Sequence, residues 1–179
     1  MTQIGNTYAA GLYDLAKDEG LCRQVLEQLN VLDAAFAREP DYLRLLSAPN
    51  LSKEERCDIL DQGFRGKVHP YVLNFMKLLT EKGYMRHFPD CCHAYRAQYN
   101  DDHGILPVCA ATAVALTPEQ TRKLTKKLEA LTGKTVELTN RIDPSVLGGV
   151  RLDYSGTRVD GTVKNRLDNI RQLLKNTIL

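Results

Sequence analysis

Hydrophobic residues recur every three to four positions through the first hundred residues, and this spacing predicts helices separated by short breaks. Glycine and proline mark breaks, as at Gly20 and Pro40. Ser52 and Glu55 form a capping-box pattern, and Pro70 suits the first turn of a helix. The predicted helices cover residues 4–17, 21–38, 41–46, a segment after Ser52, a segment from Pro70, and 88–102.

The pattern changes after Gly104. Small and β-branched residues over 105–116 predict a strand, and Thr117 with Gln120 predicts a capped helix that ends at Gly133. Further strands are predicted over 136–142, over 150–154 and around Val159, with a last helix over 162–174. We therefore expect an α+β protein, in which an N-terminal antiparallel six-helix bundle (1–104) precedes a small C-terminal β-α-β-β-β-α unit (105–179).

Composition and charge count against several classes of protein. The chain has 24 basic and 22 acidic residues, which is too balanced for a nucleic-acid-binding surface, and few aromatic residues for base stacking. Its apolar runs are shorter than the roughly 20 residues of a membrane helix, and its start lacks the features of a secretion signal. Five cysteines without a CxxC pair indicate reduced thiols in a cytosolic protein.

The glycine pair Gly148-Gly149 raises the question of a phosphate-binding loop. Neither the Walker pattern nor GxGxxG is present, and the pair precedes a predicted strand instead of opening a helix. We interpret the pair as a backbone bend or a site of close approach, and leave only weak anion binding open at Gly161.

His87, Cys91, Cys92 and His93 are the candidates for a metal site. Only His87 and Cys91 would share a helix face, whereas structural zinc needs four converging ligands, so we predict no metal and no cofactor. No local motif combines a nucleophile, a base and an orienting group, and we predict no catalytic residues.

The helix from Pro70 carries too much apolar surface for an ordinary surface helix. Six apolar positions within 72–79 cover an arc of about 220°, whereas packing on a core needs a stripe of little more than about 100°. The excess is either buried by other helices of the bundle or forms one wall of a groove for a partner helix.

One segment resembles a known family. Ile142–Leu174, IDPSVLGGVRLDYSGTRVDGTVKNRLDNIRQLL, is similar to the C-terminal motif of the delta subunit of the bacterial F-type ATP synthase, which is called the oligomycin-sensitivity-conferring protein in mitochondria. Tyr8–Leu12, YAAGL, resembles the YAxAL pattern of the family's first helix. Length and the order of the two halves agree, so the resemblance covers nearly the whole chain.

The resemblance implies a stator subunit that is not an enzyme. The N-terminal half would bind the N-terminal helix of an alpha subunit of the catalytic head, and the C-terminal half would bind the b subunits of the peripheral stalk, so that rotor torque drives ATP synthesis. It implies one copy per complex, a monomer in isolation, and peripheral attachment at the cytoplasmic face of a bacterial cell membrane through the complex, with no nucleic acid bound.

Given this resemblance, we expect the excess apolar surface of the helix from Pro70 to form a groove for a partner helix. The expected alpha-binding residues are Tyr8, Ala9, Leu12, Phe75, Leu78 and Leu79. Replacing Phe75 with aspartate is expected to abolish binding and leave the fold intact. The expected b-side residues are Val150, Leu152, Ile170 and Leu174, all of which are equally suited to a core.

Two alternatives stay open at this point. The basic residues Lys123, Lys126, Lys127, Lys134, Arg141 and Arg151 form either a solvated face or a patch for an acidic stalk helix. A small cytosolic RNA-binding accessory factor, built on a helical bundle, is the alternative function; near-neutral charge and the lack of an RNA-binding motif count against it.

Overall fold

The computed structural model describes residues 2–47, 51–146, 148–154 and 156–161. The chain divides into two compact units, residues 1–99 (unit 1) and 100–179 (unit 2), and the division falls within the last helix of the first hundred residues. The expected boundary after residue 104 lies just beyond the end of that helix.

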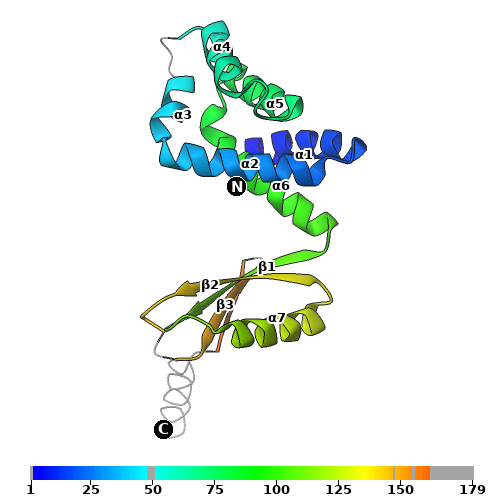
Figure 1. Cartoon of the computed structure of the whole chain (residues 1–179), viewed down its shortest axis with the longest axis vertical. Helices are drawn as coiled ribbons and strands as arrows, with labels where there is room; N and C mark the ends of the chain where they lie inside the picture. Colours follow the sequence, from blue (N-terminus) through cyan, green and yellow to red (C-terminus); the bar gives the residue numbers. More distant parts are fainter. Residues whose placement is uncertain (1, 48–50, 147, 155, 162–179) are drawn as a thin grey trace, which may run out of the picture. The chain divides into compact units, whose positions relative to one another are not determined.

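Unit 1 is helical (Figure 1). Its elements are α1 (Gln3–Asp18), α2 (Cys22–Arg38), α3 (Pro40–Leu46), α4 (Lys53–Phe64), α5 (Pro70–Glu81), the short 3-10 helix η1 (Met85–His87) and α6 (Phe88–Asp102), whose last residues belong to unit 2. The helices predicted over the first hundred residues are thus present, with ends that agree within about two residues.

The predicted start signals act as expected. Ser52 and Glu55 exchange both hydrogen bonds of the capping box at the start of α4, and Pro70 occupies the first turn of α5. At the start of α1, the Thr2 hydroxyl accepts a hydrogen bond from the Gly5 N–H at 3.2 Å. Each cap satisfies a backbone donor that the helix cannot pair internally.

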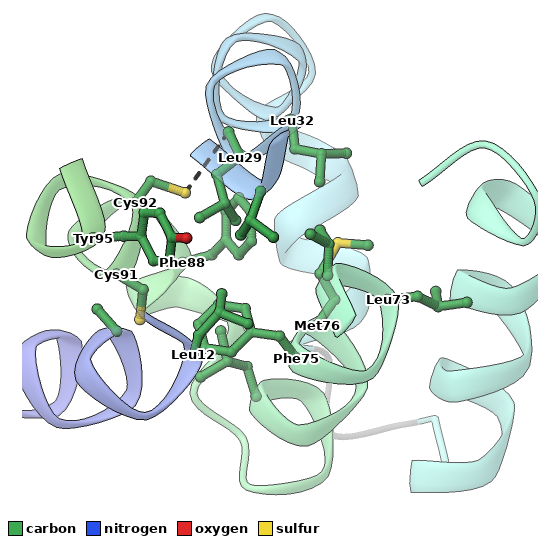
Figure 2. Close-up of a cluster of buried hydrophobic side chains, with 14 of the residues drawn as sticks. Leu12, Leu29, Leu32, Leu73, Phe75, Met76, Phe88, Cys91, Cys92 and Tyr95 are labelled. Atoms are coloured by element: carbon green, nitrogen blue, oxygen red, sulfur yellow. Dashed lines mark hydrogen bonds between the residues drawn. The ribbon is translucent and has the colours of Figure 1, made fainter. Parts of the chain in front are cut away.

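All the helices of unit 1 contribute to one hydrophobic core (Figure 2). Phe88 lies at its centre, with ring centroids 5.2 Å from Phe36 and 6.5 Å from Phe75. Fully buried side chains of the same core include Leu29 of α2, Met76 of α5 and Tyr95 of α6 itself. Removal of this apolar surface from water is the main term that holds the helices together.

Unit 2 contains a four-stranded mixed sheet and one described helix that lies along a face of the sheet (Figure 1). The elements are β1 (Ile105–Thr112), α7 (Pro118–Thr132), β2 (Thr135–Ile142), β3 (Val150–Tyr154) and β4 (Thr157–Asp160). The strand order is β2-β1-β3-β4, with β1 parallel to β2 and the other pairs antiparallel. The connection β1-α7-β2 is therefore a βαβ unit, the usual link between parallel neighbours.

Alternation along the strands gives the sheet two different faces. Leu106, Val108, Val136 and Leu152 lie on the face that packs against Leu128 of α7. The predicted α+β class is confirmed, whereas the strand expected over 105–116 is four residues too long, because pairing stops at Thr112. The helix expected over 162–174 lies outside the described residues.

Candidate partner-binding surfaces

Small residues form the buried face of α1. Gly5, Ala9 and Ala16 are buried together with Leu12, and short side chains let the helix approach its neighbours closely. Tyr13 completes this face and makes an edge contact with Tyr95 of α6, with ring centroids 5.2 Å apart.

Larger apolar residues of α1 are left on its outer side. Ile4, Tyr8 and Leu15 follow one another at helical spacing, with Gly11 in the same row, and Leu15 is 43% exposed. Apart from its chain neighbours and the backbone of α1 itself, no atom of the described residues lies within 4 Å of the position that a Cβ would take at Gly11, so this point of the helix surface is open.

The apolar arc of α5 is largely buried by unit 1 itself. Phe75 is 6% exposed and Leu79 is fully buried, together with Val72, Leu73 and Met76. Leu78 is the exception among the six arc positions, with 40% of its surface exposed.

These exposures correct the predicted groove. Ala9, Leu12, Phe75 and Leu79 are core residues, because the other helices of unit 1 cover the side of each helix that carries them. The burial of Phe75 contradicts the exposure on which the expectation of an intact fold for Phe75→Asp rested, and we now expect this replacement to disrupt the fold. Of the six expected residues, half-buried Tyr8 and exposed Leu78 have side chains within reach of a partner.

The outer sides of α1 and α5 belong to neighbouring helices. The two helices are in contact, and Tyr8 meets Tyr84, just after α5, with ring centroids 5.9 Å apart. We define the α1/α5 face as Ile4, Tyr8, Gly11, Leu15 and Leu78. Leu15 was not among the alpha-binding residues expected from the sequence. The small residues at positions 5, 9 and 16 are the signal that a separate, inward row exists.

Unit 2 contains a hollow of about 690 Å³ between α7 and the sheet end. We call it the α7 hollow. Its lining is mainly apolar and includes Val114, Leu116, Leu124 and Val150. Val114 is 74% exposed, in a stretch of four apolar residues, Ala113–Leu116, that follows the end of β1. Contiguous exposed apolar residues in a loop are typical of an interaction site.

Lysines of α7 border the same hollow. Lys123, Lys126 and Lys127 line it, and Lys123 pairs with Glu119 on the exposed surface at 2.7 Å. An exposed pair of this kind contributes little stability, so the three charges are available to a partner. The chemistry of the hollow fits an amphipathic segment with an apolar stripe and acidic flanks.

The glycine pair shapes this hollow. Gly148 and Gly149 both line it, and Gly149 has a φ of 85°, a left-handed conformation that favours glycine. At Gly161 a Cβ would lie 3.1 Å from the Val150 carbonyl oxygen, and its N–H already donates to that oxygen at 3.0 Å. That donor is therefore engaged by the Val150 carbonyl oxygen of β3. For the glycine pair, the left-handed φ of Gly149 fits the predicted backbone bend.

An ion pair holds the segment before the glycine pair. The guanidinium of Arg151 donates to Asp143 at 3.0 Å, and Asp143 also accepts the Ser145 hydroxyl at 2.6 Å. These hydrogen bonds, that of Ser145 first, lower the pKa of Asp143. The hydrogen bonds of Asp143 therefore tie the residues just after β2 to Arg151 of β3.

The four expected b-side residues have different positions. Val150 is half-buried and lines the α7 hollow, whereas Leu152 packs against the core beneath α7. Ile170 and Leu174 lie outside the described residues. The apolar run Ala113–Leu116, which sequence reasoning assigned to a strand, is the feature it missed.

The candidate metal ligands lie in unit 1. Cys91 and Cys92 are buried, and the Cys92 thiol donates to the Leu29 carbonyl oxygen at 3.8 Å (Figure 2). Burial raises the pKa of Cys91 to about 11 and that of Cys92 further, so both stay protonated thiols at neutral pH. Within the described residues, no three His, Cys, Asp or Glu side chains converge as a metal site would require.

Comparison with known proteins decides the family. The sequence profile described as "ATP synthase delta (OSCP) subunit" matches residues 4–174. The chain belongs to the ATP synthase delta (OSCP) family. As a member, it is a structural, non-catalytic subunit of the ATP synthase peripheral stalk.

Relatives in this family match the chain over almost its whole length. ATP synthase subunit delta of Lacticaseibacillus casei is 32% identical over 172 residues, covering 96% of this chain and 94% of the relative. That of Alkaliphilus oremlandii is 29% identical over 176 residues, covering 98% of each.

A solved structure shares the fold. A chain of the Toxoplasma gondii mitochondrial ATP synthase hexamer has a TM-score of 0.77, 20% identity and 97% coverage of this chain. In the described part of this delta-family chain, no helix is both long and apolar enough to span a bilayer.

Proposed function

We propose that this delta-family chain joins the two ends of the stator. Unit 1 binds the N-terminal helix of an alpha subunit through the α1/α5 face, and unit 2 binds the b subunits through the α7 hollow. The observation that carries the proposal is the pair of exposed apolar surfaces, one in each compact unit, on a chain of this family.

In this proposal, the antiparallel six-helix bundle predicted from the sequence binds the catalytic head. The predicted β-α-β-β-β-α unit binds the peripheral stalk. The chain acts at the cytoplasmic face of the cell membrane, attached through its partners, as one copy per complex. Resistance to torque requires slow dissociation, which apolar contacts provide mainly by lowering the off-rate.

The chemistry of the α1/α5 face fits an amphipathic helix. Ile4, Tyr8 and Leu15 repeat at the spacing at which a second helix presents its own apolar row, and Gly11 allows the two backbones to approach. An interface of standard size buries roughly 800 Å² on each partner, more than these side chains expose, so flanking polar residues of α1 and α5 also take part.

Calorimetric titration tests the alpha contact. The full chain is titrated with a peptide of the alpha subunit's N-terminal helix from the same organism. We expect one-to-one binding with a negative heat-capacity change, because apolar surface leaves water. If no binding is detected at several temperatures by heat or by fluorescence anisotropy, the alpha contact is wrong; binding of RNA at physiological salt would then favour the alternative function.

The lysines beside the α7 hollow give a second prediction. Exchange of Lys123, Lys126 and Lys127 for glutamate is expected to weaken binding of a C-terminal b-subunit segment by about tenfold or more. Each exchange removes an attraction and adds a repulsion, which together cost about 0.5 kcal/mol or more of binding free energy. The wild-type affinity should fall as salt rises, and the variant's affinity should change less. Glutamate at Lys17, Lys53 and Lys67, all in unit 1, is the control of equal charge. Equal loss in both variants would contradict a local role for the α7 lysines.

A further inference from the structure

Thr2 and Gly5 join the first turn of α1 to Asp90 at the start of α6. The Thr2 hydroxyl donates to Asp90 Oδ2 at 2.9 Å and, through its lone pair, accepts the Gly5 N–H that it caps. Gly5 packs directly on Asp90, because a Cβ at Gly5 would lie 3.0 Å from the Asp90 Cβ and 3.1 Å from its carbonyl carbon. Asp90 therefore orients the cap through its carboxylate, while its Cβ and backbone carbonyl lie against the turn that the cap starts.

A row of rings connects Asp90 to the α1/α5 face. His87 Nδ1 lies 3.7 Å from Asp90 Oδ2, and the His87 ring contacts Tyr84, with centroids 6.3 Å apart. Tyr84 contacts Tyr8 of α1. The Arg86 guanidinium donates to His87 Nε2 at 3.1 Å, which leaves Nδ1 as the nitrogen that carries the proton toward Asp90. Tyr8 of α1 is thus linked to the Asp90 carboxylate through the rings of Tyr84 and His87.

We propose that Asp90 is a positioning residue for partner binding: through Thr2 and Gly5 it fixes the first turn of α1, and so presents Ile4 and Tyr8 in the conformation that the partner helix requires. The inference rests on the proposed alpha contact. A first turn is the part of a helix that frays most readily, since its N–H groups have no partner within the helix. Fraying would remove Ile4 from the face, and the apparent affinity falls by the fraction of molecules that are frayed. The Thr2 hydrogen bond also keeps the pKa of Asp90 below its usual value, so the carboxylate stays ionised and accepts this hydrogen bond at neutral pH.

Isosteric variants of Thr2 test this role, with the full chain titrated with the alpha-helix peptide. Thr2→Val keeps the shape and loses both hydrogen bonds, so we expect affinity to fall by about three- to fivefold, the factor that corresponds to a lost cap. Thr2→Ser keeps the hydroxyl and should restore wild-type affinity. Asp90→Ala should weaken binding similarly, and the double variant Thr2→Val/Asp90→Ala should lose little more, because both remove one coupled interaction.

Ser52→Ala is the matched control, because it removes the cap of α4, which is not part of the face. It should lower the melting temperature and leave the affinity unchanged. The role of Asp90 is overturned if Thr2→Val binds like the wild type, if Thr2→Ser binds as weakly as Thr2→Val, or if Ser52→Ala weakens binding equally. Absence of binding by the wild-type chain would overturn the proposed alpha contact itself, and with it this role, whereas the first three outcomes leave the alpha contact standing.

Discussion

Replacing Phe75 with aspartate is expected to unfold unit 1. Phe75 is 6% exposed and packs near Phe88 in the centre of the core. Loss of a buried phenylalanine side chain costs about 3–5 kcal/mol, and a buried carboxylate without a partner costs several kcal/mol more. Together these approach or exceed the 5–15 kcal/mol that stabilises a typical domain.

Far-ultraviolet circular dichroism of the full chain measures this result. The helical signal of α1 to α6 should be largely lost at 25 °C, or its midpoint in urea should fall sharply. Phe75→Leu is the control, since a smaller apolar side chain should cost only about 1 kcal/mol and keep the helices. A folded Phe75→Asp variant would contradict the position of Phe75 in the core.

Helices and strands followed from the sequence because their determinants are local. Capping pairs such as Ser52 with Glu55, and apolar spacing, act within a few residues of the backbone they order. The strand that ended early shows the limit. Ala113–Leu116 has the composition of a strand, but pairing stops at Thr112. The pairing partners of β1 begin at Thr135 in β2 and at Val150 in β3, far from it in the sequence.

The candidate surfaces were less predictable for the same reason. The apolar arc of α5 was equally compatible with a core and with a groove, and only the packing of the other helices shows that Phe75 and Leu79 are covered while Leu78 is not. On α1, the row of Gly5, Ala9 and Ala16 lies beside the row of Ile4, Tyr8 and Leu15. The size of the side chains does not tell which of the two rows is buried. The hollow beside α7 joins residues from 112 to 161, so no local pattern indicates it.

Replacing Leu78 with aspartate is expected to abolish binding of the alpha helix and leave unit 1 folded. The side chain is already 40% exposed, so a carboxylate there stays hydrated and costs little stability. In the complex, the same carboxylate would lose its hydration against the apolar row of the partner. This costs about 2 kcal/mol or more of binding free energy, which lowers the affinity roughly thirtyfold or more. Val31→Asp is the matched control: Val31 is 70% exposed on α2, outside the α1/α5 face, and its replacement should leave the affinity unchanged.

The contrast with Phe75 makes this pair of experiments decisive. Phe75 and Leu78 lie three residues apart on the same helix, yet the first variant should lose binding through loss of the fold and the second with its melting curve intact. Wild-type affinity in a folded Leu78→Asp variant would remove α5 from the interface and leave the outer row of α1 to carry the contact. Equal loss of binding in Val31→Asp would mean that added negative charge, and not the position of Leu78, weakens the complex.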